Sequence, residues 1–435
     1  MKFTSTRNKS ISVGFSQAVL DCMPDDGGLY VPFETEDLRR WILYTDENTT
    51  FQSIAGSLTS AFIREEFSPI ICETIATTAF KFAPEIKTLD KNLFLLELFH
   101  GPTGIHKDFG ISYLAACIET IFNLKGGRAT FLDISTGELG ASLAFALRGK
   151  RNIKAVLLYP KGTVRGLVDE DLFWNGGNIL PIEIDGTEED CHNIMRKIFA
   201  EKSFVRNNFL TVANTANIGR LLPQAFFYPF AFSRIKNKVN SSIFYSLAPG
   251  NYSNVVAGLY AWQFALPLNG FVLPATSALG TNPSGEPNLL DSIVPLKQRT
   301  PADPSEPSNL ERLEDIFSAN NAMMRHFIFP IPIDENEVNA AAKELFLKYN
   351  VLVDRHTARA YASSKNYAAS KGDEMGATVL VARDSPALSA EFVRHTIGEI
   401  PETTESIKKS FEKVNLKKPA MHSLDDIKKI IQTIK

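Results

Sequence analysis

From about residue 93 onward, short runs rich in β-branched and aliphatic residues alternate with longer stretches of helical periodicity. Strands separated by helices form parallel sheets, because each helix carries the chain back across a face of the sheet. The alternation therefore predicts an α/β fold, and no other feature of the chain constrains the topology as strongly. It predicts eight strands: Leu93–Leu96, Ala129–Ile134, Lys154–Tyr159, Ile179–Ile184, Phe209–Ala213, Ser242–Leu247, Gly270–Leu273 and Ala377–Ala382.

The first ninety or so residues differ from the rest of the chain, since strand signals are few and apolar residues between Phe51 and Phe82 recur at helical spacing. We therefore expect a mainly helical N-terminal region (1–94), a smaller α/β domain (95–215) and a larger α/β domain (216–435). Residues 280–309 are rich in Pro, Ser, Asn and Gly and should form a long loop or insertion. Long ordered loops are often functional, but an ordinary surface loop explains this composition equally well.

The composition excludes several classes of protein. With 46 basic and 49 acidic residues the net charge is -3, which leaves no basic patch for nucleic acid or an anionic membrane. Four scattered cysteines form no CxxC pair, so we expect reduced thiols and no structural metal. The N-terminus lacks an apolar signal core, and no run of 18 apolar residues occurs. These features predict a cytoplasmic protein large enough to be an enzyme.

Candidate functional residues lie at strand-to-helix joints, because ligands of open α/β sheets bind beyond the carboxyl ends of the strands. The first joint, His100–Gly110, contains Lys107 in a loop or in the first turn of a helix that Gly126-Gly127 ends. A lysine at that place opposes the helix dipole, and partial burial would lower its pKa and favour the nucleophilic amine. A lone lysine at a helix start is more often a solvated surface residue.

Two further joints suit anions, because free N–H groups at a helix start bind phosphate or carboxylate. Ser135-Thr136-Gly137-Glu138-Leu139-Gly140 follows one predicted strand, and Pro249-Gly250-Asn251-Tyr252-Ser253-Asn254 follows another. Either could equally be an ordinary turn. A fourth joint at Asp354–Ala358 places a histidine beside an aspartate, where a structural role is the commoner case. His100 and His106 have no evident third ligand for a metal.

These segments together resemble the short-form threonine synthases, in order and spacing, over nearly the whole chain. The shared segments are Val13–Ala18, Asp26–Pro32, Phe99–Thr103, Lys107–Gly110, Tyr159–Gly162, Asn214–Gln224, Gly250-Asn251, Pro307–Asn309 and His356–Ala358. The resemblance implies a fold type II enzyme that depends on pyridoxal phosphate (PLP), with two α/β domains and parallel-type sheets. Its reaction would convert O-phospho-homoserine and water to threonine and phosphate by elimination and hydration, with PLP as the electron sink.

The resemblance also assigns roles. Lys107 would carry PLP as a Schiff base and shuttle protons. The loop Gly250, Asn251, Tyr252, Ser253 and Asn254 would hold the cofactor phosphate. The loop containing Ser135, Thr136, Gly137 and Glu138 would hold the substrate carboxylate. Charge and location in the sequence, rather than the resemblance, make Asn217, Arg220 and Lys161 candidates for binding the substrate phosphate. The cofactor should lie in the cleft between the two α/β domains.

The departures from the family pattern are concentrated in the site loops. The family loop Thr-Ser-Gly-Asp-Thr-Gly is Ser135–Gly140 here, and Gly-Asn-Phe-Gly is Gly250–Ser253. If the second glycine of that loop needs a positive φ, Ser253 would be strained by roughly 1–2 kcal/mol. The family's Leu-Ala-Phe before the lysine is Gly104-Ile105-His106, and its Thr-Ala-His-Pro is Ala382-Arg383-Asp384-Ser385. Ala382 offers no hydroxyl to the pyridine nitrogen, and Ser385 is the candidate replacement.

Three functions remain compatible with the sequence. One is a threonine synthase with a divergent pocket. Another is a related PLP-dependent phospho-lyase with a different substrate or product. The third is a catalytically impaired threonine synthase-like protein that serves as a binding partner. Retention of Lys107 argues against the third, since a protein without catalysis has no need for that amine. The expected ligand is a small phosphorylated amino acid, and the expected assembly is a monomer or homodimer.

Overall fold

Two separate parallel sheets organise the chain. The computed structural model describes residues 1–282, 287–289, 294–318, 320–372 and 376–434. The larger sheet has six strands in the order β13-β10-β9-β14-β4-β3, parallel throughout except for the antiparallel edge strand β3. Its strands are β3 (Glu85–Asp90), β4 (Leu93–Glu97), β9 (Ile243–Ser246), β10 (Gly270–Pro274), β13 (Ile328–Ile331) and β14 (Ala377–Ala382).

The smaller sheet has four parallel strands in the order β7-β6-β5-β8. They are β5 (Ala129–Ile134), β6 (Ile153–Pro160), β7 (Ile179–Ile184) and β8 (Leu210–Thr211). All eight predicted strands are therefore confirmed, and so is the α/β class. The predictions missed the edge strands β3 and β13. β13 contains Pro330, which interrupts the strand signal, and β3 is mostly polar and lies at an exposed edge.

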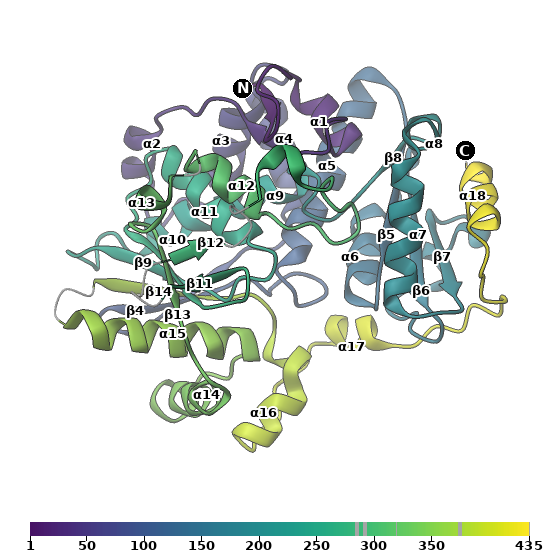
Figure 1. Ribbon diagram of the computed structural model, residues 1–435. Helices are drawn as coiled ribbons and strands as arrows, with labels where there is room; N and C mark the ends of the chain where they lie inside the picture. Colours follow the sequence, from purple (N-terminus) through teal and green to yellow (C-terminus); the bar gives the residue numbers. More distant parts are fainter. Residues whose placement is uncertain (283–286, 290–293, 319, 373–375, 435) are drawn as a thin grey trace.

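Side-chain alternation along the strands gives the six-stranded sheet two apolar faces. Leu95, Leu380 and Ala382 pack against α14 (Glu335–Tyr349) and α15 (Arg355–Lys371) on one face. Their neighbours in sequence, including Phe94, Leu96, Val379 and Val381, point to the other face. Figure 1 shows α14 and α15 below this sheet and most of the other helices above it. The helices on that second face include α3 (Phe51–Ile63), α4 (Pro69–Ala79), α10 (Phe227–Ile235) and α11 (Ser253–Gln263).

The four-stranded sheet is covered in the same way. α5 (Lys107–Lys125) and α6 (Glu138–Leu147) pack on the face that carries Phe131 and Leu157. α7 (Glu188–Ala200) covers the face that carries Leu132 and Val156, together with the C-terminal α18 (Leu424–Thr433). α5 begins at Lys107 and ends at Gly126, whose φ of 71° a glycine adopts without strain. The predicted helix after Lys107 and its glycine end are thus confirmed.

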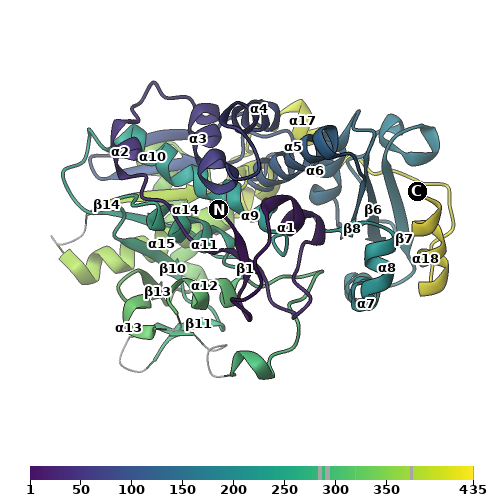
Figure 2. The ribbon, with the colours of Figure 1, turned by 90° about the horizontal axis from the view of Figure 1, so that it is seen from above.

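The N-terminal region lies partly over the larger sheet and partly near the junction between the two sheets, as Figure 2 shows from above. It contains the two-stranded sheet β1 (Phe3–Ser5) and β2 (Tyr30–Pro32), with α1 (Phe15–Asp21), α2 (Arg39–Tyr44), α3 and α4. Four of these six elements are helices, as expected. The expected division into three domains remains a prediction, but the observed sheets bear on its boundary, since β3 and β4 join the larger sheet.

Three segments connect the two halves of the molecule. α8 (Lys202–Asn207) and β8 lead into α9 (Ile218–Leu221), and a 3₁₀ turn (Leu222–Phe226) continues into α10. Residues 279–324 contain the hairpin β11 (Leu279–Thr281) and β12 (Pro287–Leu289), α12 (Leu310–Ile316) and α13 (Asn321–Met324). Residues 283–286 and 290–293 of the predicted 280–309 loop lie outside the described residues. After α16 (Ala390–Thr396) the chain crosses through α17 (Glu405–Phe411) to α18 on the smaller sheet (Figure 1).

One buried arginine ties these parts together. Arg312 of α12 is fully buried, and its guanidinium donates to the carbonyl of Tyr30 (3.0 Å), the carbonyl of Thr215 (2.5 Å) and the carbonyl of Ala216 (3.0 Å). It also donates to the side-chain oxygen of Asn309 at 2.7 Å. These acceptors belong to β2, to the segment after β8 and to the start of α12, so a single side chain fixes all three.

All four cysteines are free and buried. Among the described helices, none combines the length and the apolar character needed to cross a bilayer.

Replacement of Arg312 by Met should destabilise the fold by about 3 kcal/mol or more, because several buried carbonyls would lose their donor at once. Urea denaturation measures the change in the free energy of unfolding. Arg394→Met, at an exposed position of α16, is the matched control and should change stability by less than about 0.5 kcal/mol. Equal effects of the two replacements would contradict the role given to Arg312.

Candidate active site

One cavity of about 460 Å³ collects residues from most of the joints that the sequence singled out. Nine of the predicted site residues line it: Lys107, Ser135, Thr136, Glu138, Arg220, Gly250, Asn251, Ser253 and Asn254. Topology explains the convergence, since the joints after β5, β9 and β14 lie at carboxyl ends of parallel strands. Residues from both sheets contribute, so the cavity lies between the two halves of the molecule.

Lys107 is the first residue of α5 and is half-buried in the cavity wall. Within the described part of the chain its amine makes no hydrogen bond and no ion pair. Burial lowers the pKa of this amine from its usual range, and the nearby carboxylates of Asp384 and Glu138 oppose that shift. A lysine with a lowered pKa carries more of the uncharged, nucleophilic amine at neutral pH.

The loop after β5 is organised by its own serine. The Ser135 hydroxyl oxygen accepts hydrogen bonds from the backbone N–H groups of Gly137 and Gly140, each at 2.9 Å. Glu138 begins α6 and faces the cavity, but its carboxylate accepts a hydrogen bond from Arg165 at 3.0 Å. The arginine therefore balances a negative charge that would otherwise repel an anionic ligand.

The loop after β9 leads directly into α11. Its positive φ belongs to Tyr252 (64°), while Ser253 is the first helical residue and is not among the residues with positive φ. The expectation of a strained Ser253 is therefore wrong, because the left-handed turn comes one residue earlier. Asn251 donates to the Thr215 hydroxyl at 2.8 Å, which ties this loop to the segment after β8.

Arg220 of α9 presents a buried guanidinium to the cavity. Its side chain is only 3% exposed, and its Nε and Nη1 atoms have no hydrogen-bond partner among the described residues. Burial lowers its pKa to about 10, opposed by the carboxylates of Asp108 and Asp133, so it stays a cation at neutral pH. Gly110 makes room for it, since a Cβ at that position would lie 1.9 Å from Arg220 Nη1. A buried cation with unused donors suits an anionic ligand.

Arg383 and His192 repeat this feature. Both line the cavity, and Arg383 Nε and His192 Nδ1 are buried without a partner in the described structure. The Arg383 Nη1 atom donates to the carbonyl of Ala248 at 3.1 Å, which holds its guanidinium beside the loop after β9. Three residues that line this cavity therefore carry buried nitrogen atoms without a partner among the described residues, and two of the three are arginines.

Five predicted site residues do not line this cavity. Asn217 is fully buried and caps α9, accepting from the Gly219 N–H at 3.0 Å and donating to the Val19 carbonyl at 2.8 Å. Lys161 is exposed and pairs with Asp185 at 3.3 Å. These surroundings give both side chains structural partners away from the cavity.

The other three are Gly137, Tyr252 and Ser385. Gly137 lies beneath the Arg165 guanidinium, and its φ of 141° is accessible to glycine alone among common residues. Tyr252 is buried, with its hydroxyl 2.5 Å from that of Thr276. Ser385 is buried and caps the 3₁₀ turn Pro386–Ser389, its hydroxyl accepting from the Ala387 N–H at 3.3 Å.

Sequence reasoning assigned no role to several residues that line the cavity. Arg383 follows β14 directly, so its position at a strand end was an available signal. Gln224 and Asn214 lie in a segment that the resemblance quoted. Glu188 and His192 are four residues apart on α7, and only tertiary packing turns that face of the helix inward. The loop before α12 also contributes wall residues: Ser305, Glu306 and Pro307.

His106 forms a buried pair with Asp384. Its Nδ1 lies 3.1 Å from Asp384 Oδ1, and the His106 and Asp384 side chains are 11% and 20% exposed. Burial lowers the pKa of His106 to about 4, although the aspartate partly opposes this. The bond with His106 and the charge of Arg383 hold the pKa of Asp384 below its usual range against the effect of burial. At neutral pH the ring is therefore neutral and the carboxylate ionised.

The remaining histidines of the predicted joints have simpler surroundings. His356 is exposed beside Asp354, whose carboxylate caps α15. The ligand atoms of His100, Glu85 and Glu97 lie within 4.8 Å of one another, a grouping that the sequence did not reveal. Lys87 already pairs with Glu97 at 2.7 Å, and this ammonium group competes with any cation for that carboxylate.

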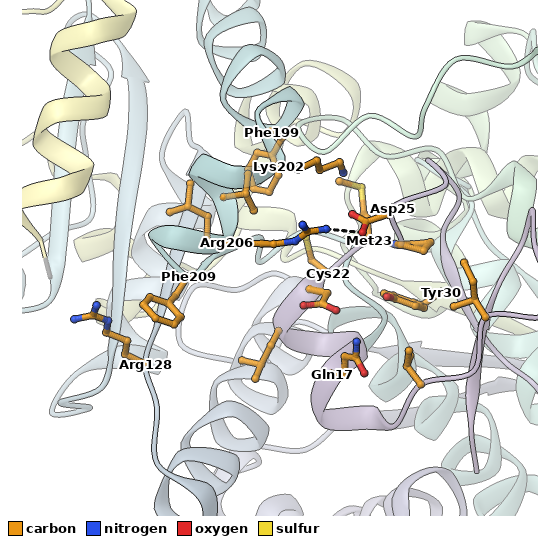
Figure 3. Close-up of a pocket in the computed structure, with 17 residues that line it drawn as sticks. Gln17, Cys22, Met23, Asp25, Tyr30, Arg128, Phe199, Lys202, Arg206 and Phe209 are labelled. Atoms are coloured by element: carbon orange, nitrogen blue, oxygen red, sulfur yellow. Dashed lines mark hydrogen bonds and ion pairs between the residues drawn. The ribbon is translucent and has the colours of Figure 1, made fainter.

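A second cavity, of about 520 Å³, lies between α1 and α8. Figure 3 shows that Arg206 and Asp25 face each other there as an ion pair, at 2.5 Å, with Phe209 and Arg128 at one end. None of the predicted site residues lines it, and the charged side chains around it are exposed. The cavity at Lys107 is smaller but contains the buried charges.

Comparison with known proteins gives two family matches. The family described as pyridoxal-phosphate dependent enzyme matches residues 71–383, and the family described as threonine synthase N terminus matches residues 2–80. A threonine synthase of Buchnera aphidicola subsp. Schizaphis graminum is 31% identical over 367 residues, which cover 83% of this chain and 84% of that protein. The threonine synthase of Escherichia coli K12 is 30% identical over 321 residues, covering 73% and 74%.

Solved structures share the fold. A PLP-bound threonine synthase from Brucella melitensis superposes with a TM-score of 0.82 at 22% identity, covering 100% of this chain and 99% of that one. Threonine synthase from Escherichia coli gives a TM-score of 0.78 at 23% identity, with 100% of both chains covered. The fold type II architecture expected from the resemblance is thereby confirmed.

Gly110→Ala should displace the Arg220 guanidinium and lower the free energy of unfolding by about 1–3 kcal/mol, because the new methyl group has no room. Urea denaturation measures the loss. Asn123→Ala, on the exposed face of the same helix, is the control and should be nearly neutral. A Gly110→Ala variant as stable as this control would show that the space around Arg220 is not tight.

His106→Asn should flatten the pH dependence of stability on the acidic side. Because the folded-state pKa of His106 is about 4 and its unfolded value is 6.5, the unfolded chain binds more protons between these values. The unfolding free energy therefore rises from pH 4 to pH 6.5, and the variant should lose on the order of 1–3 kcal/mol of that rise. Denaturation at several pH values tests this. The exposed His422→Asn should keep the slope unchanged, and an unchanged slope in the His106 variant would contradict the prediction.

Proposed function

Because the chain belongs to the pyridoxal-phosphate dependent enzymes and, among them, to the threonine synthase family, we propose that it converts O-phospho-homoserine and water to threonine and phosphate. The observation that carries the proposal is the single cavity whose lining includes a lysine with a lowered pKa and the guanidinium groups of Arg220 and Arg383, each with at least one buried nitrogen atom that has no partner among the described residues. Such a cavity offers a nucleophile and anion sites together, and both the cofactor and the substrate are phosphorylated.

The residues present fit PLP. The uncharged form of an amine reacts with the cofactor aldehyde, and burial lowers the pKa of Lys107 and so favours that form. The loop Gly250–Asn254 leads into the eleven-residue helix α11, whose N-terminal N–H groups suit the cofactor phosphate. Gly250 is exposed at the cavity wall and has no side chain to keep the phosphate from its backbone. When bound, PLP supplies the electron sink for elimination.

The substrate carboxylate and phosphate would use separate parts of the cavity. The backbone around Thr136 and the start of α6 lie on one wall, and Ser135 keeps that loop rigid by accepting two of its N–H groups. Arg220 is the strongest candidate for the phosphate, because its guanidinium is a buried cation that lines the cavity and its Nε and Nη1 atoms have no partner among the described residues. Asn217 supports this role indirectly by capping the short helix that carries Arg220.

Lys107 would also move protons once it is released from the cofactor. A general base works best when its pKa lies near the working pH, and burial shifts the pKa of Lys107 in that direction. Enclosure between the two halves of the molecule limits the entry of water, which must add at one stage of the reaction only. Glu138 and Arg165 lie at the edge of this enclosure and could adjust when the substrate carboxylate arrives.

Two alternatives were compatible with the sequence: a related phospho-lyase with another product, and a protein without catalysis. The relatives named above are all threonine synthases, which does not favour the first. The second does not account for the Lys107 amine and the converging cationic side chains, which would be costly to keep without a ligand. A cytoplasmic location and a monomeric or homodimeric state remain predictions.

Lys107→Ala should abolish covalent attachment of PLP and lower the rate of threonine formation by several orders of magnitude. Borohydride reduction followed by peptide mass spectrometry locates the attachment, and product analysis with O-phospho-homoserine measures the reaction. Lys107→Arg is the matched control, since it keeps the positive charge but not the reactive amine. It should show the same loss of PLP attachment and of threonine formation as Lys107→Ala. Attachment at another lysine, or release of phosphate without threonine, would overturn the proposed function.

A further inference from the structure

The two segments that depart from the family pattern nearest to Lys107 contact each other. The His106 N–H donates to the Arg383 carbonyl at 2.8 Å, and the Ser385 N–H donates to the Gly104 carbonyl at 2.8 Å. A β-bridge pairs Ile105 with Asp384 between these two hydrogen bonds. The backbone thus holds the loop after β14 against the residues that precede Lys107, and the side chains of His106 and Asp384 meet across this pairing.

Both oxygens of the Asp384 carboxylate face a nitrogen donor. Oδ1 lies 3.1 Å from His106 Nδ1, and Oδ2 lies 3.6 Å from Arg383 Nη2. All three side chains are at most 20% exposed. Since the ring is neutral and its Nδ1 faces a carboxylate, the proton belongs on Nδ1, which donates to Asp384. The Asp384 carboxylate is therefore held by two partners, His106 and Arg383, and Lys107 is not one of them.

Four charged groups act on Lys107 from three different elements. Asp384 and Glu138 favour its ammonium form, whereas Arg383 and Arg220 favour the amine. Of the four groups, Asp384 has the largest effect on the pKa of Lys107, so the position of its carboxylate strongly influences the protonation of the amine. Glu138 is already paired with Arg165 at 3.0 Å. Each of the two carboxylates near Lys107 thus has another cation or donor as its partner.

We propose that His106 and Arg383 clamp the Asp384 carboxylate away from Lys107, with His106 as the positioning residue that keeps the lysine amine free. The purpose of the clamp rests on the proposed function, because a free amine is what attachment of PLP requires. Its geometry does not, since every contact lies within this chain. Without His106, Oδ1 of Asp384 would be an unoccupied acceptor on a carboxylate whose charge already acts on Lys107, and an ion pair between the two would compete with the reaction.

The clamp predicts opposite effects of two substitutions on the amine. In His106→Leu the freed carboxylate turns to Lys107 and raises its pKa by about one unit or more. In Asp384→Asn the negative charge is gone while Arg383 and Arg220 remain, so the pKa of Lys107 falls. His106→Gln retains a side-chain N–H and should titrate like the unaltered protein. A merely structural role would expose Lys107 to water in both His106→Leu and Asp384→Asn, and would raise its pKa in both.

The experiment measures the rate of acetylation of Lys107 by acetic anhydride across pH, by peptide mass spectrometry of the full chain, with the exposed Lys161 as internal reference. Only the uncharged amine reacts, and no cofactor is needed. The pH at which the acetylation rate of Lys107 is half its maximum, called the midpoint below, reports the pKa of the amine. The clamp is supported if, relative to the unaltered protein, this midpoint is higher in His106→Leu, lower in Asp384→Asn and unchanged in His106→Gln. A His106→Leu midpoint equal to that of the unaltered protein, or a rising midpoint in Asp384→Asn, overturns it. Circular dichroism checks that each variant is folded. If His106→Leu unfolds, Asp384→Asn, which has nearly the same side-chain volume as the unaltered residue, still decides whether the clamp stands.

Attachment of PLP, measured in the same preparations by borohydride reduction, separates this proposal from the proposed function. If the unaltered protein attaches no PLP but the acetylation midpoints move as stated, the proposed function fails and the clamp stands. If PLP attaches at Lys107 and the midpoints do not move, the clamp fails alone.

Discussion

The hydrogen bonds of the buried Arg312 guanidinium are the constraint on which the cavity depends. They join β2, the segment after β8 and the start of α12, and Asn309 extends the network by donating to the Thr215 hydroxyl at 3.0 Å. Asn251 donates to the same hydroxyl, so the loop before α11 is fixed to the chain that carries Arg220. Because these groups come from distant parts of the sequence, one arginine aligns both halves of the site.

The chemistry of the cavity follows from burial of charge. A charged group loses its hydration when it is buried, and this cost shifts its pKa unless a partner compensates. Lys107 has no partner among the described residues and tends toward the amine, whereas Arg220 keeps its charge with help from Asp108 and Asp133. Asp384 stays ionised through His106 and Arg383. Burial thus favours the amine at Lys107, leaves a cation at Arg220 and leaves a carboxylate at Asp384, according to the neighbours of each group.

Much of the fold was predictable because local patterns report burial. Strands such as Ala129–Ile134 and Ala377–Ala382 are buried on both faces and consist mostly of apolar residues, and their predicted bounds agree with the observed ones. β3 escaped prediction because it is an exposed antiparallel edge, where the pattern is weak. For the site, nine predicted residues converge because strand ends converge. Lys161 and Asn217 do not, since charge and location in sequence cannot tell which way a side chain points.

The sequence by itself determined the α/β class and the strand-to-helix joints at which the candidate site residues lie, because periodicity and strand-end position are local properties. The role of Lys107 followed from the family resemblance and remains a prediction. Only the tertiary structure decided which polar side chains share the cavity. It places Arg383, Glu188 and His192 in the cavity wall, and it puts His106 and Asp384, which are 278 residues apart in the sequence, in hydrogen-bond contact. It also set the protonation states, since a pKa depends on burial and on neighbours in space. Those neighbours are fixed by packing between the two sheets, which no local pattern records.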